Sequence, residues 1–165
     1  MASFSSRNRS TAVVPAPRDA IWKVLSDPGA LADLTPLVKA ISADGDLWCW
    51  QLNGISALGV SVAPAFTERM AFVDGERIDF EPDPPFGEQR AGATGTYLLS
   101  DGPDGGTQLA IDITITAELP LPRAAKRAVE KVMATTMEKT GNRFARNLYE
   151  RLGLDPKFVA SPEPA

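Results

Sequence analysis

Few side chains in this sequence can carry out chemistry, and Glu68 is the most prominent of them. The chain contains no histidine and a single cysteine. Glu68 belongs to the alternating run 66–72, in which every second residue shares one face of a predicted strand. On that face its carboxyl group lies among Phe66, Met70 and Phe72, where an unpaired charge is costly and a shifted pKa is expected. We therefore interpret Glu68 as a candidate polar anchor or general acid/base of an apolar site.

A second interpretation gives Glu68 no role in a site. The residue could lie near an open mouth of the fold and pair there with Arg69, Arg77 or Arg90. The sequence leaves both interpretations open. If the protein is an enzyme, Glu68 would act with Tyr97 or with an arginine as its partner in proton transfer.

Other kinds of chemistry lack their usual residues. Without histidine, a nucleophilic serine or cysteine would need a lysine or glutamate as its base, and Cys49 falls on the strand face opposite Trp48 and Trp50. The carboxylates are scattered without the spacing of a metal site, so we expect neither a metal nor a cofactor. A net charge of −4 argues against nucleic-acid binding.

Length and composition predict one globular domain. The chain has 165 residues, of which 44% are hydrophobic, and we place the domain at residues 1–153. Residues 154–165 are rich in proline and lack periodicity, so we expect a disordered tail. The polar start, the single cysteine and the lack of a long apolar run predict a cytoplasmic protein that contacts the inner face of a membrane at most peripherally.

The periodicities predict an α+β fold. A first strand is expected at 10–14, followed by short helices at 18–26 and around 30–34. Alternating runs separated by Gly, Asp and Pro then predict several strands up to residue 118. Between two of them, a three-residue loop at 74–76 keeps Phe72 and Ile78 on the same face, whereas a two-residue loop would mix the faces.

A long amphipathic helix is predicted from Pro120 to about Leu152. Between residues 123 and 151 it carries eight Lys or Arg and three Glu. Arg123, Arg127 and Lys131 repeat at intervals of four, where like charges repel each other. They form either an ordinary solvated face or a docking surface for an anionic membrane or an acidic protein.

The opening and closing motifs carry a family resemblance. Residues 13–17 (VVPAP) lead into 21–28 (IWKVLSDP), and 106–109 (GTQL) lead into the last strand. With these motifs the chain, from Arg9 to Leu152, resembles the START-like helix-grip (SRPBCC) superfamily, including its polyketide cyclase/dehydratase branch and the branch of the G-type subunit of carbon monoxide dehydrogenase. The resemblance implies a seven-stranded antiparallel sheet wrapped around the last helix, with a pocket between them.

Alternation along the strands and the stripe of the last helix select the residues expected to face that pocket. The candidate ligand-binding residues are Trp48, Trp50, Phe66, Glu68, Met70, Phe72, Phe80, Tyr97, Ile111, Ile113, Met133, Met137 and Phe144. Phe86, in a proline-rich loop, is a candidate gate. We expect the protein to bind, and to transport or deliver, a hydrophobic small molecule such as a lipid, quinone or polyketide. The alternatives are a cyclase or dehydratase and a partner-binding domain with a filled core.

Overall fold

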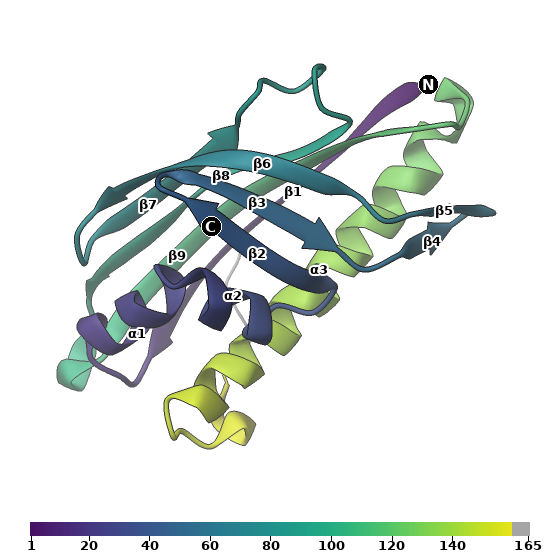
Figure 1. The fold of residues 1–165 in the computed structure, drawn as a ribbon. Coiled ribbons are helices and arrows are strands. Elements are labelled where there is room, and N and C mark those ends of the chain that lie inside the picture. The colour runs from purple at the N-terminus through teal and green to yellow at the C-terminus, as the bar shows by residue number, and fades with distance from the viewer. Residues whose placement is uncertain (160–165) are drawn as a thin grey trace.

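A computed structural model describes residues 1–159 of the chain. Its main element is a seven-stranded antiparallel sheet in the order β1-β9-β8-β7-β6-β3-β2 (Figure 1). The strands are β1 (Ala2–Val14), β2 (Val38–Asp44), β3 (Leu47–Leu52), β6 (Ala65–Val73), β7 (Arg77–Pro82), β8 (Ala91–Asp101) and β9 (Thr107–Leu119). The sheet confirms the predicted α+β class and the number of strands.

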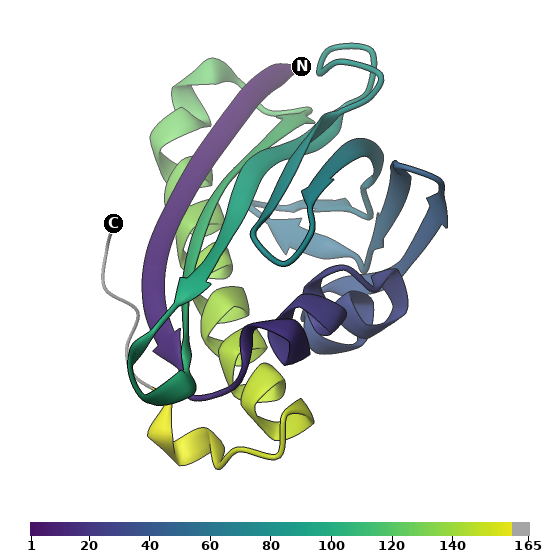
Figure 2. The same cartoon turned by 90° about the vertical axis from the view of Figure 1, so that its left-hand side faces the viewer.

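The long C-terminal helix, α3 (Lys126–Arg151), lies across one face of the sheet. In Figure 2, α3 runs beside β1. The short helices α1 (Arg18–Leu25) and α2 (Pro28–Leu34) lie on the opposite side of the C-terminal half of α3. We call the sheet face toward α3 the inner face and the opposite one the outer face. A single 3-10 turn, η2 (Arg123–Ala125), precedes α3, so the helical segment begins slightly later than predicted.

Local sequence explains how α2 begins and how it is held against α3. The Asp27 carboxylate accepts hydrogen bonds from the backbone N–H groups of Gly29 and Ala30, at 2.9 and 3.3 Å, and Pro28 occupies the first helical position. At the far end of α2, the Asn147 side chain of α3 donates a 2.9 Å hydrogen bond to the Leu34 carbonyl. The two helices are therefore linked by a polar contact as well as by packing.

The register of β6 and β7 agrees with the prediction made from the turn. Phe72 pairs with Ile78 and Met70 with Phe80, across the loop that contains Gly75. Gly75 has a φ of 71°, a conformation that favours glycine. This register places the large apolar side chains of both strands on the inner face.

The first strand is longer than predicted. β1 begins at Ala2, not at Ser10, and pairs with β9 along its whole length, from Ala2 opposite Leu119 to Val14 opposite Thr107. Its first half reads as polar in sequence, yet Phe4 is buried there. Pairing with the long strand β9 therefore determines where β1 begins, because the polar residues at the start of β1 have only weak β propensity of their own.

Two other segments differ from the sequence-based expectation. A two-stranded sheet, β4 (Ile55–Ala57) and β5 (Val60–Val62), forms a hairpin between β3 and β6 that the sequence pattern does not predict. After α3, Leu154 packs against the core and a 3-10 turn, η3 (Pro156–Phe158), follows. The rest of the predicted tail, residues 160–165, lies outside the described residues.

Candidate functional site

The candidate site is built on the inner face of the sheet, where directly paired residues share one side. Across β3 and β6, Trp48 lies opposite Glu68 and Trp50 lies opposite Phe66. A further row on the same face runs from Phe72 of β6 through Ile78 of β7 and Tyr97 of β8 to Ile111 of β9. The register therefore places the predicted strand residues on one continuous face.

A glycine makes room for the aromatic centre of this face. Gly95 of β8 lies opposite Phe80 of β7, and a Cβ atom at Gly95 would stand 2.7 Å from the Phe80 ring. Without that atom, the Phe80 ring lies over β8, with its centroid 5.3 Å from that of Tyr97. The absence of a side chain at residue 95 is therefore a packing requirement of the site.

Glu68 is the one charged residue in the core of the described chain. Only 1% of it is exposed, and neither carboxylate oxygen accepts a hydrogen bond from a described residue. Burial raises the pKa of Glu68 from 4.5 to about 8. The backbone N–H of Ala93 lowers this pKa in part, although it lies outside hydrogen-bond geometry with both carboxyl oxygens. At neutral pH the carboxyl group is therefore mainly protonated.

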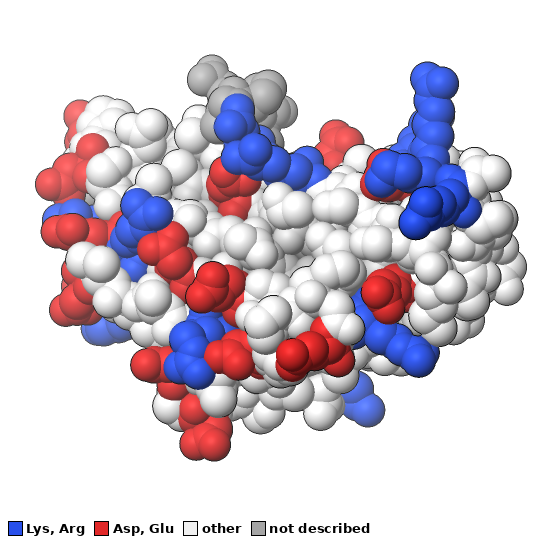
Figure 3. Space-filling view, turned by 90° about the horizontal axis from the view of Figure 1, so that it is seen from above, with Lys and Arg blue, Asp and Glu red and all other residues white. Residues whose placement is uncertain are grey.

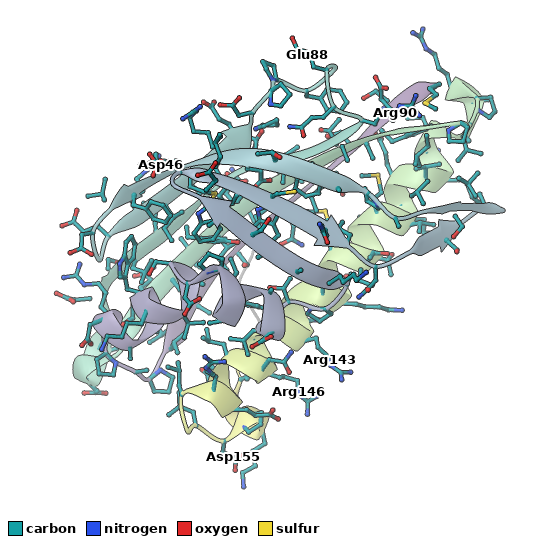
Figure 4. All side chains as sticks on the ribbon, viewed as in Figure 1. Asp46, Glu88, Arg90, Arg143, Arg146 and Asp155 are labelled. Atoms are coloured by element: carbon teal, nitrogen blue, oxygen red, sulfur yellow. The ribbon has the colours of Figure 1, made fainter. Side chains whose placement is uncertain are left out.

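The arginines considered as partners of Glu68 are engaged elsewhere or lie outside the core. Arg69 binds Asp83, with 2.6 Å between its Nη2 and the carboxylate, and Arg77 binds Asp79 at 2.7 Å. Arg90 is exposed on the connection that precedes β8 (Figure 4). The ion-paired interpretation of Glu68 is therefore wrong in this structure.

Two further polar groups belong to the same face. The indole Nε1 of Trp50 is buried and has no hydrogen-bond partner among the described residues. Burial, followed by the nearby Glu68 carboxylate, raises the pKa of the Tyr97 hydroxyl, so that hydroxyl stays protonated. The inner face thus presents potential hydrogen-bond donors within an apolar surface.

The other predicted residues differ in how deeply they are buried. Trp48, Phe66, Met70, Phe80 and Tyr97 are all buried in the main core. Several residues are only partly buried and pack against that core: Trp50, Ile111, Ile113 and Phe144. The inner face therefore keeps accessible apolar surface at the centre of the sheet and on the facing side of α3.

Three predicted residues lie away from this centre. Met133 packs in a second cluster with Phe4 and Val129, near the start of α3. Met137 is partly buried one turn further along the helix. Phe72 is 38% exposed at the rim of the inner face, where its ring contacts those of Trp22 and Trp48 at centroid distances of 6.2 and 5.8 Å.

Sequence reasoning missed Trp22 as part of the site. Trp22 lies on α1, and its edge-on contact with Phe72 brings that helix to the rim of the inner face. The helical spacing assigned Trp22 only to an amphipathic helix. Its contact with the sheet depends on how α1 packs against the sheet, and the local sequence pattern does not predict that packing.

Phe86, the predicted gate, is 37% exposed in the loop between β7 and β8. Gln89 holds this loop to β6, because its side chain donates hydrogen bonds to the carbonyls of Thr67 and Pro84, both at 2.8 Å. In Figure 4 the loop, marked by Glu88, projects from the side of the sheet opposite α3. A gating role for Phe86 stays a prediction.

Two hollows on the surface of the described residues are lined by neither Glu68, Trp50 nor Tyr97. The larger, of about 860 Å³, opens on the outer face, where the Arg7–Asp112 ion pair borders it. The smaller, of about 440 Å³, lies beside Leu37 of the α2–β2 connection and Asn147 of α3. The lining of the larger hollow includes Met70, Phe72 and Phe80, whereas neither hollow reaches Glu68 or Trp50.

Comparison with known proteins identifies the family. Residues 7–152 match the model of the family described as "Polyketide cyclase / dehydrase and lipid transport", and the chain belongs to this family. Its fold is therefore the START-like helix-grip fold. Binding of a hydrophobic ligand, or a cyclase role, is the class of function that this family suggests. A comparison with curated protein sequences finds no match.

Solved structures show the same fold at low sequence identity. The aromatase/cyclase ZhuI from Streptomyces sp. R1128 is 15% identical, with a TM-score of 0.66 over 91% of this chain and 94% of that one. A START superfamily protein from Mycobacterium smegmatis is 17% identical, with a TM-score of 0.63 over 89% and 97%. Identities this low establish the fold and leave the ligand to be argued from the residues of this chain.

Proposed function

We propose that the protein binds a hydrophobic small molecule between the inner face of its sheet and α3. The observation that carries this proposal is Glu68, a buried carboxyl group whose two oxygens have no hydrogen bond within the described residues. A buried polar group without a partner costs about 1–3 kcal/mol, so folded proteins rarely retain one without a use. A ligand that bonds to Glu68 would remove this cost.

The apolar lining supports the same proposal. Ile111 and Ile113 face α3 from the centre of the sheet, yet both remain partly accessible. Phe144 on α3 is partly accessible as well. All three residues pack against the core without being enclosed by it, so apolar surface remains accessible between the two layers. An apolar ligand would cover this surface and gain hydrophobic free energy.

A fluorescence titration tests the location of the ligand. N-phenyl-1-naphthylamine is a neutral apolar probe whose emission rises when it leaves water. Ile113→Trp adds bulk to the inner face, and we expect it to weaken binding of the probe about tenfold, or roughly 1.4 kcal/mol. Thr114→Trp, on the outer face of the same strand beside the larger hollow, is the matched control and should bind as the unchanged protein does.

The outcomes of this titration separate the alternatives. Weaker binding in Thr114→Trp alone would place the probe on the outer face and contradict the proposal. Absence of binding in the unchanged protein would favour the partner-binding domain with a filled core. A cyclase or dehydratase, in which protonated Glu68 acts as the acid beside Tyr97, would in addition show turnover that is lost in Glu68→Gln.

We also propose that the protein delivers its ligand at an anionic membrane. Arg123, Arg127 and Lys131 are all exposed at the start of α3. The β4–β5 hairpin lies at the same end of the molecule (Figure 1), and Leu58 at its tip is 53% exposed. No charged residue occurs between 47 and 67. In Figure 3 this end shows uncharged surface next to gathered basic side chains.

Such a combination suits a peripheral membrane contact, in which cations attract anionic headgroups and an apolar tip enters the interface. No helix among the described residues is long and apolar enough to cross a membrane. Each basic residue near such a membrane contributes about 1 kcal/mol, which salt would screen.

Vesicle flotation tests the membrane contact. The protein should float with vesicles of phosphatidylglycerol and phosphatidylcholine and remain behind with phosphatidylcholine alone. Changing Arg123, Arg127 and Lys131 to Glu should abolish flotation. The same change at Lys139, Arg143 and Arg146, further along α3, is the control with equal charge (Figure 4 shows Arg143 and Arg146). Equal loss in both variants would indicate attraction by net charge only, and no flotation of the unchanged protein would leave an acidic protein as the partner to seek.

A further inference from the structure

Two buried polar groups on adjacent strands lack hydrogen-bond partners. They are the Trp50 indole Nε1 on β3 and the Glu68 carboxyl oxygens on β6. Trp50 pairs with Phe66 and Glu68 pairs with Trp48, so the two residues are diagonal neighbours on the inner face. Diagonal neighbours in an antiparallel pair lie about 7–8 Å apart, within reach of one small molecule.

Both groups offer protons to a ligand. The indole nitrogen of Trp50 can only donate a hydrogen bond. Glu68 is mainly protonated at neutral pH because burial raises its pKa to about 8, and a protonated carboxyl group donates one hydrogen bond. A ligand that satisfies both groups must therefore present two acceptors.

The surroundings favour a ligand without net charge. The register of β3, β6, β7, β8 and β9 places no lysine or arginine on the inner face beside Glu68 and Trp50. The Lys and Arg residues of α3 are exposed to solvent. A buried carboxylate or phosphate on the ligand would consequently lack a compensating cation, which is costly in an apolar environment.

We propose that the interior site recognises a neutral, apolar molecule carrying two oxygen acceptors, such as the two carbonyl oxygens of a quinone. Glu68 donates to one oxygen and Trp50 donates to the other, while Trp48 and Phe66, their directly paired neighbours on the same face, contact the apolar frame. This inference rests on the proposed binding function and narrows the class of ligand. It also explains why a carboxyl group and an indole N–H are buried together on otherwise apolar strands.

Competition between two matched ligands tests this inference. The probes are 2,3-dimethyl-1,4-naphthoquinone, whose reactive ring positions are blocked, and 2,3-dimethylnaphthalene, which has the same rings without the oxygens. Each is measured by its displacement of N-phenyl-1-naphthylamine. Two neutral hydrogen bonds should give the quinone an advantage of about tenfold over the hydrocarbon at pH 6.5. The advantage should shrink at pH 9.5, where Glu68 is ionised and no longer donates.

Variants assign the two hydrogen bonds. Trp50→Phe and Glu68→Leu should each lower the ratio of quinone affinity to hydrocarbon affinity several-fold, because each removes one donor. This ratio is the readout, since either substitution also changes the apolar lining that both compounds contact. Glu68→Gln retains a donor, so it should keep the preference and lose its dependence on pH. Proton NMR of the unchanged protein gives a readout that needs no variant to fold. One indole N–H signal among the three tryptophans should shift downfield with the quinone and not with the hydrocarbon.

The outcomes distinguish this inference from the proposed function. Equal affinity for both compounds would overturn the two-acceptor inference and leave binding in the interior intact. Displacement by the hydrocarbon alone would overturn it in the same way. If the naphthylamine itself does not bind, or binds with no effect of Ile113→Trp, the proposed function fails and the inference fails with it.

Discussion

Glu68 and Trp48 lie directly opposite each other on β6 and β3, and both are almost fully buried, with 1% and 3% of their surfaces exposed. A carboxyl group is thereby enclosed beside a large aromatic ring. Desolvation of this kind favours the neutral form of an acid. The pair has consequences for stability as well as for binding.

The pH dependence of stability is the first consequence. Below about pH 4.5 Glu68 is protonated in both the folded and the unfolded chain, so its titration adds no pH dependence to the stability there. Between pH 4.5 and about 8 the unfolded chain releases this proton while the folded chain retains it. The free energy of unfolding therefore falls by roughly 1.4 kcal/mol for each pH unit in this window on account of Glu68.

Glu68→Gln should remove this dependence. The amide does not ionise, so the variant should be more stable than the unchanged protein at pH 8 and should differ little from it at pH 4.5. Urea unfolding at both pH values measures the difference. If the gap between the two proteins does not widen as pH rises, Glu68 is not buried in the folded protein.

The packing at Gly95 makes a second prediction. Any larger side chain there meets the Phe80 ring and the backbone carbonyl of Asp112. We expect Gly95→Ala to lower the free energy of unfolding by about 2 kcal/mol, because the added Cβ atom would clash with the Asp112 backbone carbonyl and with the Phe80 ring, so β9 and the ring must both shift. The loss should also weaken binding of N-phenyl-1-naphthylamine.

Gly141→Ala provides the matched control for that substitution. Gly141 lies in α3, is exposed, and has open space around its Cα atom. Alanine is the better helix former, so this variant should gain about 0.5–1 kcal/mol. Urea denaturation of both variants would contradict the packing argument if Gly95→Ala were as stable as the unchanged protein.

A third prediction concerns Thr107, the first residue of β9, which pairs with Val14 at the end of β1. It is completely buried, and its hydroxyl donates a 2.8 Å hydrogen bond to the Ala16 carbonyl. Thr107→Val keeps the shape and removes the donor, so we expect a loss of about 1–2 kcal/mol and a fall of a few degrees in Tm. Thr135→Val, which removes an exposed hydroxyl bonded to Lys131, should change the stability by less than about 0.5 kcal/mol.

The parts of the fold that the sequence predicted are those with strong local patterns. The Phe72–Ile78 register followed from keeping apolar residues on one face, and the structure has the same pairing. The start of β1 could not be predicted, because its polar residues become a strand only by pairing with β9. The β4–β5 hairpin is likewise defined by its position between β3 and β6.

In the candidate site, too, the features with a local sequence pattern could be predicted, and the features that depend on tertiary contacts could not. Alternation was sufficient to place Glu68 among apolar residues, since inner and outer positions follow directly from the period of a strand. Whether Glu68 pairs with an arginine depended on where Arg69 and Arg77 find their carboxylates, which is a property of the folded sheet. The lack of a hydrogen-bond partner for the Trp50 indole could not be predicted either, because the sequence does not show which groups lie near an indole nitrogen in the folded chain.

Native mass spectrometry of the purified protein, followed by solvent extraction and identification of any released molecule, tests the central claim most directly. We expect a complex heavier than the chain by the mass of one small apolar molecule, which is lost on denaturation and carries two oxygen acceptors. A protein that is consistently empty, and that also fails to bind N-phenyl-1-naphthylamine, would contradict the claim that its interior is a binding site.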